Sequence, residues 1–180
     1  MGRLTQLQPY STVYWHYKQW RAAGVIATLM KTLHAQVREQ VKKKPKWTRL
    51  IIIDSQAVKN TCNAGVNSKG FCFYKATNGI KRHLAVDTLG FPFFTHCTPA
   101  NVSDDAGLIE MLSLNIDYFK SKPVNIPKIT ILLDHGYHVD HLIEALEKVY
   151  PQIMTKIRFE LSTKPSKQEK RHQENPDLFR

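Results

Sequence analysis

The spacing of apolar residues changes near residue 47 and divides the chain into a helical part and a strand-rich part. Before this point Val13, Tyr17 and Trp20 recur at helical spacing, and a second apolar stripe follows them. The lysine-rich segment 42–46 contains a proline and is typical of a linker. We therefore expect residues 1–46 to form an N-terminal helical segment with a basic linker.

The helical segment is rich in aromatic residues, with Tyr14, Trp15, Tyr17 and Trp20 close together. We expect these side chains in a helical core rather than on a surface that stacks on nucleic-acid bases. The pattern leaves two roles open for the segment, a DNA-binding appendage or one half of a helical cap.

From Thr48 onward, short runs of β-branched and aromatic residues predict strands, and longer apolar stripes predict helices. The segment from Asp87 to Gly90 predicts the turn of a hairpin. The polar residues 162–180 predict a disordered tail. The expected strands are 48–54, 81–87, 91–96, 128–134 and 152–158, and the expected helices are 104–114 and 138–149.

The order of these elements predicts an α/β fold with a mixed sheet, in which three antiparallel strands precede parallel strands with right-handed crossover helices. Asp54 and Asp134 each end a strand, so both would reach one edge of the sheet, where open α/β sheets bind ligands. Two like charges about 4 Å apart repel by roughly 4 kcal/mol at an effective dielectric of about 20. A divalent cation between them, or a proton on one, would remove this cost.

The charge balance of the chain favours a polyanionic partner. Lys and Arg number 26 against 15 Asp and Glu, which gives a net charge of +11 and a pI near 9.6. Nucleic acid is the commonest partner of such basic proteins. The three cysteines form no Cys-x-x-Cys pair, and no apolar run suits a signal peptide or a membrane span. We therefore expect a soluble intracellular protein.

Four phrases of the chain, in the right order, resemble the DDE transposases of bacterial insertion sequences. The similarity extends from about residue 10 to about residue 170 and implies the ribonuclease H-like fold of a transposase catalytic core for residues 47–161. The phrases are STVYWHYKQW (11–20), IDSQAVK (53–59), GIKRHLAVDTLG (79–90) and LDHGY (133–137).

The resemblance implies phosphoryl transfer on DNA. Asp54 and Asp134 would be the first two acids of the catalytic triad and would hold two divalent ions, magnesium by preference. One ion would activate water or a 3′-hydroxyl, and the other would stabilise the leaving oxygen. The implied partners are double-stranded DNA, as element ends and target, and further copies of the chain in the DNA complex. The implied location is the bacterial cytoplasm, at the nucleoid when DNA is bound.

The third acid of the family, a glutamate on a helix after the last core strand, has no clear match. Glu160 lies too close to the final expected strand, and Glu169 lies in a lysine-rich segment. Glu174 has a plausible separation from Asp134 and follows Arg171, but Pro176 close behind it would break a helix, so it is the weakest candidate. We therefore expect the chain to end before the last block of the family, which would leave catalysis by this chain alone incomplete.

The basic triplet Lys81, Arg82 and His83 has two interpretations of equal weight. These residues either line a DNA path through contacts with its backbone, or they form a solvated basic strand edge. Asp87 is interpreted as a turn residue rather than a metal ligand.

The remaining acids and histidines of interest have simpler structural interpretations. Ser103 or Asp104 is placed to cap the helix at 104–114, and Asp105 is placed as a first-turn residue. His135, His138 and His141 are spaced three apart, but no fourth ligand is evident and we expect no zinc site. His135 directly follows the second aspartate and is placed to touch a phosphate.

Two classes of function therefore remain. The first is a transposase that cuts and joins the ends of an insertion element, and the second is a catalytically inactive DNA-binding fragment of one. A free-standing metal-dependent nuclease is a third and weaker interpretation. The missing glutamate distinguishes the first class from the second.

Overall fold

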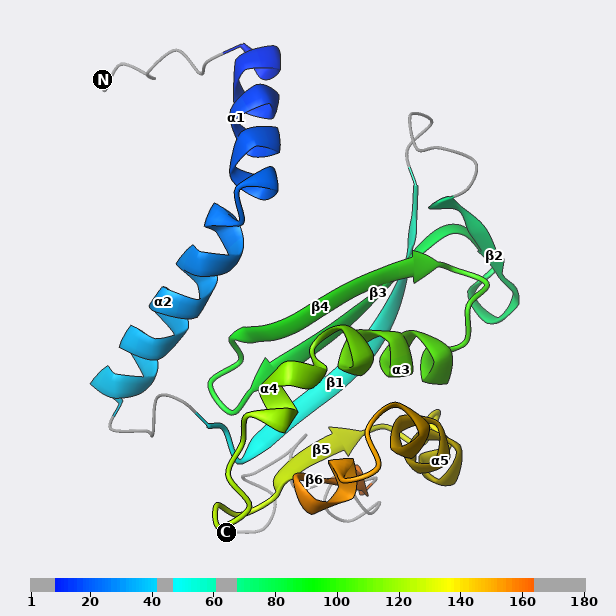
Figure 1. The fold of residues 1–180 in the computed structure, drawn as a ribbon. Helices are drawn as coiled ribbons and strands as arrows, with labels where there is room; N and C mark the ends of the chain where they lie inside the picture. Colours follow the sequence, from blue (N-terminus) through cyan, green and yellow to red (C-terminus); the bar gives the residue numbers. More distant parts are fainter. Residues whose placement is uncertain (1–8, 42–46, 61–67, 164–180) are drawn as a thin grey trace, which may run out of the picture. The chain divides into compact units, whose positions relative to one another are not determined.

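The computed structural model describes residues 9–41, 47–60 and 68–163. The chain forms two compact units, Met1–Trp47 and Thr48–Arg180 (Figure 1). The predicted basic linker and nearly all of the predicted polar tail lie outside the described residues.

The first unit contains two helices, α1 (Tyr10–Ala22) and α2 (Val25–Gln40). Gly24 lies between them with φ of 67°, a left-handed conformation that glycine adopts without strain. The helices follow one another instead of packing side by side (Figure 1). No residue of α1 is buried, so the prediction of a helical core for its aromatic residues is wrong. Because the chain does not turn back, Tyr14 instead stacks between two other tyrosines on the helix surface.

The second unit is built on a six-stranded sheet. Its strands are β1 (Leu50–Lys59), β2 (Gly70–Cys72), β3 (Thr77–Asp87), β4 (Pro92–Pro99), β5 (Ile129–Leu133) and β6 (Ile157–Leu161). The strand order is β2-β3-β1-β5-β6, with β4 also paired to β3. Pairing is antiparallel between β3 and each of β1, β2 and β4, and parallel from β1 to β5 and from β5 to β6. The predicted mixed sheet is therefore confirmed.

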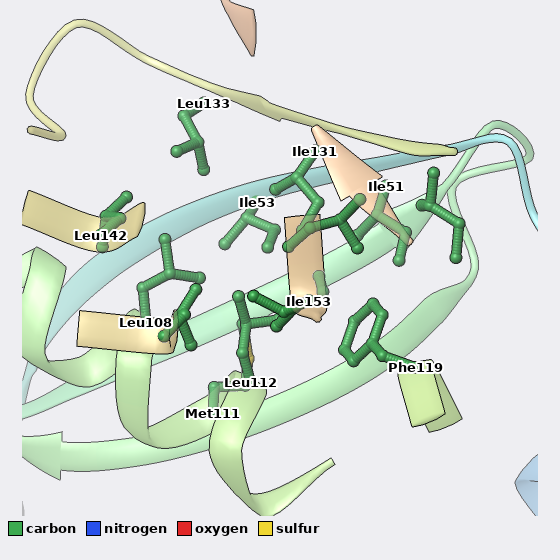
Figure 2. Packing of buried hydrophobic residues seen from close by; sticks show 14 of the residues in the cluster. Ile51, Ile53, Leu108, Met111, Leu112, Phe119, Ile131, Leu133, Leu142 and Ile153 are labelled. Atoms are coloured by element: carbon green, nitrogen blue, oxygen red, sulfur yellow. The ribbon is translucent and has the colours of Figure 1, made fainter. Parts of the chain in front are cut away.

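Helices pack against the sheet and bury one of its faces. Burial alternates along β1, where Ile51 and Ile53 are buried and Ile52 is exposed, as expected for a strand with one covered face. On the covered face these isoleucines meet Leu108, Leu112 and other buried side chains of the helices (Figure 2). No helix in the described ranges is long and apolar enough to cross a membrane. The helices are α3 (Asp104–Leu114), α4 (Ile116–Lys120) and α5 (Val139–Val149).

The largest differences from the predicted bounds are in β1, β3, β4 and β6, and each has a physical reason. β3 begins at Thr77 instead of residue 81, because residues 77–79 pair with β2, and β4 ends at Pro99 instead of residue 96, because it stays paired with β3 that far. β1 continues to Lys59, because it stays paired with β3 after its pairing with β5 ends at Ile52. The last strand begins at Ile157 instead of residue 152, because Ile153–Thr155 first form a 3-10 turn.

The turn between β3 and β4 is confirmed. Gly90 N donates to Asp87 O at 2.9 Å, and Gly90 has φ of 77°. β2 and α4 have no counterpart among the predicted elements, because segments of 3 and 5 residues are too short to show a clear period.

Candidate active site

The register of β1 and β5 places Asp54 beside Asp134. Leu50 pairs with Thr130 and Ile52 with Leu132, and the same offset carries Asp54 onto Asp134, the first residue after β5. Neighbouring strands lie roughly 4.8 Å apart, so both carboxylates lie at the same end of two adjacent parallel strands. Asp54 lies within β1, not at its end as predicted, at the point where the parallel partner stops.

Both carboxylates are exposed and accept hydrogen bonds from the backbone. Asp54 Oδ1 accepts from Ser55 N at 2.7 Å, and Asp134 Oδ1 accepts from Gly136 N at 2.9 Å. A Cβ at Gly136 would lie 3.1 Å from Asp134 Oδ1, so the turn brings its backbone close to the carboxylate. Among the described residues, neither carboxylate forms an ion pair. Their negative charge is therefore available to a cation.

Asp104 connects three elements on the covered face of the sheet. Its Oδ1 accepts a hydrogen bond from Ser55 Oγ at 2.6 Å and forms an ion pair with Lys81 Nζ at 2.9 Å. Burial raises the pKa of Asp104, but the hydrogen bonds from Ser55 and Lys81 and the charge of Lys81 outweigh it, so this pKa lies below its ordinary value. Asp104 is therefore an ionised partner of Lys81.

Asp105 connects α3 to the first turn of α5. Its Oδ1 accepts from His138 N at 3.2 Å, and its Oδ2 lies 2.8 Å from His138 Nδ1. His141 Nδ1 is 3.8 Å from the same Oδ2. The carboxylate thus receives a backbone N–H at the start of α5, the role of a cap supplied from another helix.

Tyr137 stands behind the turn that carries Asp134. Its side chain belongs to the core, and its buried hydroxyl makes no hydrogen bond among the described residues. Burial raises the pKa of Tyr137, and the charge of Asp104 raises it further. An interaction with the Ser55 side chain lowers this pKa, and the charges of Asp54 and Asp134 raise it. Three carboxylates therefore lie close enough to act on one buried hydroxyl.

The predicted basic triplet is divided between the two faces of β3. Arg82 is exposed, whereas Lys81 is 8% exposed and His83 is 1% exposed. Lys81 is bound to Asp104, so a contact with DNA would require it to leave that carboxylate.

His83 is packed tightly between β3 and α3. Its Nε2 lies 3.1 Å from Thr98 Oγ1, and burial lowers its pKa to about 4. A Cβ at Gly107 would lie 2.1 Å from His83 Nε2, so only glycine lets α3 approach this closely. His83 is therefore a neutral residue of the interior near the site.

The exposed aspartates fit a hard divalent ion better than zinc. Mg²⁺ typically binds one or two carboxylates and keeps several waters or substrate phosphates. Zinc prefers three or four nitrogen and sulfur ligands. No cluster of three His, Cys, Asp or Glu suited to a metal occurs in the part of the chain that the structure describes, the three histidines after Leu133 included. Two exposed carboxylates are therefore ligands of the kind that a hard divalent cation takes.

Sequence reasoning missed the roles of Ser55, Asp104 and Asp105. Of the two caps that the sequence offered for α3, Ser103 and Asp104, the structure uses Ser103, whose Oγ accepts from Ala106 N at 3.1 Å, and Asp105 lies in the first turn as predicted. One signal for Asp104 was available in the sequence. Lys81 alternates with buried residues of β3, so its ammonium lies on the covered face and needs an acidic partner there.

Comparison with known families identifies the family of this chain. A sequence model of the transposase DDE domain matches residues 46–178. The match covers most of the chain, and the chain therefore belongs to the transposase DDE domain family. The mixed sheet is compatible with the ribonuclease H-like fold of these transposases, which generally use divalent metals and act on DNA. Comparisons with curated proteins and with solved structures gave no significant match.

Proposed function

We propose that this chain carries out metal-dependent strand cleavage and strand transfer on DNA at the ends of a transposable element. The observation that carries the proposal is the register that sets Asp54 beside Asp134 at an exposed edge of the sheet. Family membership supplies the process of transposition, and the net charge of +11 suits a DNA substrate.

Asp54 and Asp134 would hold the divalent ions, magnesium by preference, because carboxylate oxygens are the ligands of hard cations. Bound there, the ions would activate water or a 3′-hydroxyl and stabilise the leaving oxygen. In the reaction a new bond forms between the attacking oxygen and phosphorus, and the bond between phosphorus and the leaving oxygen breaks. The attacking water or hydroxyl loses one proton, and the leaving oxygen takes one up. The backbone donors at Ser55 and Gly136 hold one oxygen of each carboxylate in place.

Arg82 is the member of the basic triplet best suited to contact DNA. It is exposed on β3, between Gln56 of β1 and Cys97 of β4. His135, exposed and next to Asp134, is the second candidate. Both would contact phosphates and contribute affinity that falls with salt, rather than base preference. In this proposal several copies of the chain act together on element ends and target DNA in the bacterial cytoplasm.

The test is a cleavage and joining assay with the purified chain, magnesium or manganese, and duplexes that end in the terminal repeats flanking its gene. Cleavage that requires the metal and is lost in Asp54→Asn and in Asp134→Asn supports the proposal. Asp117→Asn is the matched control, because Asp117 is exposed on α4. Equal cleavage by all three variants would refute the proposal.

A second function, DNA binding without catalysis, is favoured by the small number of acids at the site. Within the described residues no third acid joins the exposed pair, and Glu160 is paired with Arg158 at 3.0 Å. Glu169 and Glu174 lie outside those residues. Binding to element ends with no cleavage in either metal would support this function. Cleavage of unrelated duplexes, with no preference for ends, would indicate a metal-dependent nuclease.

A further inference from the structure

The part of β1 that carries Asp54 is hydrogen-bonded to a neighbouring strand on one side only. Its pairing with β5 ends at Ile52 in the described sheet, whereas pairing with β3 continues through Asp54 to Lys59. A strand with one paired edge is freer to twist than one paired on both sides. The direction of the Asp54 side chain therefore needs a further restraint.

Ser55 provides a point at which such a restraint can act. Successive side chains of a strand point to opposite faces, so the exposed Asp54 and the half-buried Ser55 turn in opposite directions. Ser55 Oγ donates to Asp104 Oδ1 at 2.6 Å, and Ser55 N donates to Asp54 Oδ1 at 2.7 Å. Fixing the hydroxyl of Ser55 limits rotation of the strand and keeps its N–H directed at the Asp54 carboxylate.

Asp104 is itself fixed, so it can serve as the anchor. Lys81 Nζ forms an ion pair with Asp104 Oδ1 at 2.9 Å and donates to Val102 O at 2.6 Å. Lys81 is 8% exposed, and the start of α3 is capped by Ser103. The ammonium also offsets the charge of Asp104, which therefore does not compete with the exposed aspartates for a cation.

We propose that Asp104 is a positioning residue that directs the Asp54 carboxylate through the hydroxyl of Ser55. This inference rests on the proposed function, in which Asp54 binds metal. It adds that metal affinity depends on Asp104, which does not itself contact the metal. Partners that orient metal ligands typically change metal affinity about 10- to 100-fold when they are removed.

The test measures Mn²⁺ affinity of the full chain by titration calorimetry without DNA, in a double-mutant cycle. Ser55→Ala and Asp104→Ala, which removes the acceptor of the Ser55 hydroxyl, should each weaken the affinity about tenfold, and the double variant should be no weaker than either. Ser55→Thr keeps the hydroxyl, so its Mn²⁺ affinity should lie within about threefold of that of the unchanged protein. Asp117→Asn is the matched control and should leave the affinity unchanged.

Additive losses in the cycle, or no loss in either single variant, would overturn the inference. If Asp104→Ala does not fold, the Mn²⁺ affinities of Ser55→Ala and Ser55→Thr decide, and equal affinities in these two variants would overturn the inference. Amide hydrogen exchange over residues 53–56 without metal separates this inference from the proposed function. Faster exchange in Ser55→Ala than in Ser55→Thr supports positioning, and equal exchange contradicts it, even if Mn²⁺ binding does not depend on Asp54.

Discussion

Two pairs of aspartates in the second unit differ in what surrounds them. Asp54 and Asp134 are exposed and receive their described hydrogen bonds from backbone N–H groups. Asp104 and Asp105 begin α3 and are bound by side chains of β1, β3 and the start of α5. The residue type is the same in both pairs, but the environment leaves the first pair open to a ligand and makes the second pair part of the contacts between elements.

The contrast shows why partners, rather than residue type, decide the role of a carboxylate. An ionised carboxylate has about four positions at which it can accept a hydrogen bond or a cation. Asp104 uses Oδ1 for two side-chain donors, one of them charged. The exposed pair keeps charge and lone pairs for a ligand, and removing that charge should not weaken the fold.

The largest expected effect separates activity from stability at the exposed pair. Asp134→Asn should lower the rate of DNA cleavage about 10³-fold or more, because metal binding supplies several kcal/mol of transition-state stabilisation. Its melting temperature should stay equal or rise slightly, since the change removes repulsion with Asp54. Calorimetry beside the cleavage assay measures both. A melting temperature lowered as far as that of Asp104→Ala would erase the distinction between the pairs.

The next effect tests the architectural pair. Asp104→Ala should lower the free energy of unfolding by about 2 kcal/mol, because it leaves Lys81 buried without a counter-ion. This is less than the roughly 3–5 kcal/mol of a fully buried pair, since the Asp104 side chain is 39% exposed. Urea denaturation measures it. Adding Lys81→Met should recover most of the loss, and failure to recover would show that the charge of Lys81 is not the cause.

The covered side of the site should also be sensitive to acid through His83. Its pKa is lowered by burial to about 4, against 6.5 ordinarily, so the unfolded chain takes up a proton that the folded chain rejects. Stability is therefore full above about pH 6.5 and falls as the pH drops toward about 4, with a loss of about 1.8 kcal/mol from about pH 7 to about pH 5. Denaturation curves of His83→Gln should lack this component. Parallel curves for both proteins would contradict it.

The smallest effect concerns Asp105. Asp105→Ala should destabilise the protein by about 1 kcal/mol, because His138 N at the start of α5 loses its acceptor. Asp140→Ala, in the first turn of the same helix, changes a helix-dipole contact alone and should cost less than about 0.5 kcal/mol. Thermal denaturation compares them. Equal losses of stability in the two variants would mean that the contact between Asp105 and the start of α5 does not stabilise the protein.

Local pattern predicted much of the second unit. The helices at α3 and α5, the turn at Gly90 and the mixed sheet follow from apolar spacing and turn residues, which act over a few neighbouring positions. The same reasoning was wrong for the aromatic residues of α1, because a stripe of apolar side chains does not show whether the chain supplies a partner for it. Short elements such as α4 contain too few residues to show a helical or strand period in their apolar positions.

The sequence by itself determined which strands deliver Asp54 and Asp134, because β-branched runs followed by an acid are local features. Only the tertiary structure decided that Asp54 lies within its strand, that Lys81 faces Asp104, and that Ser55 joins them. These facts depend on register and on the side of the sheet that α3 covers. Both are set by contacts between residues far apart in the chain, and a local pattern does not encode such contacts.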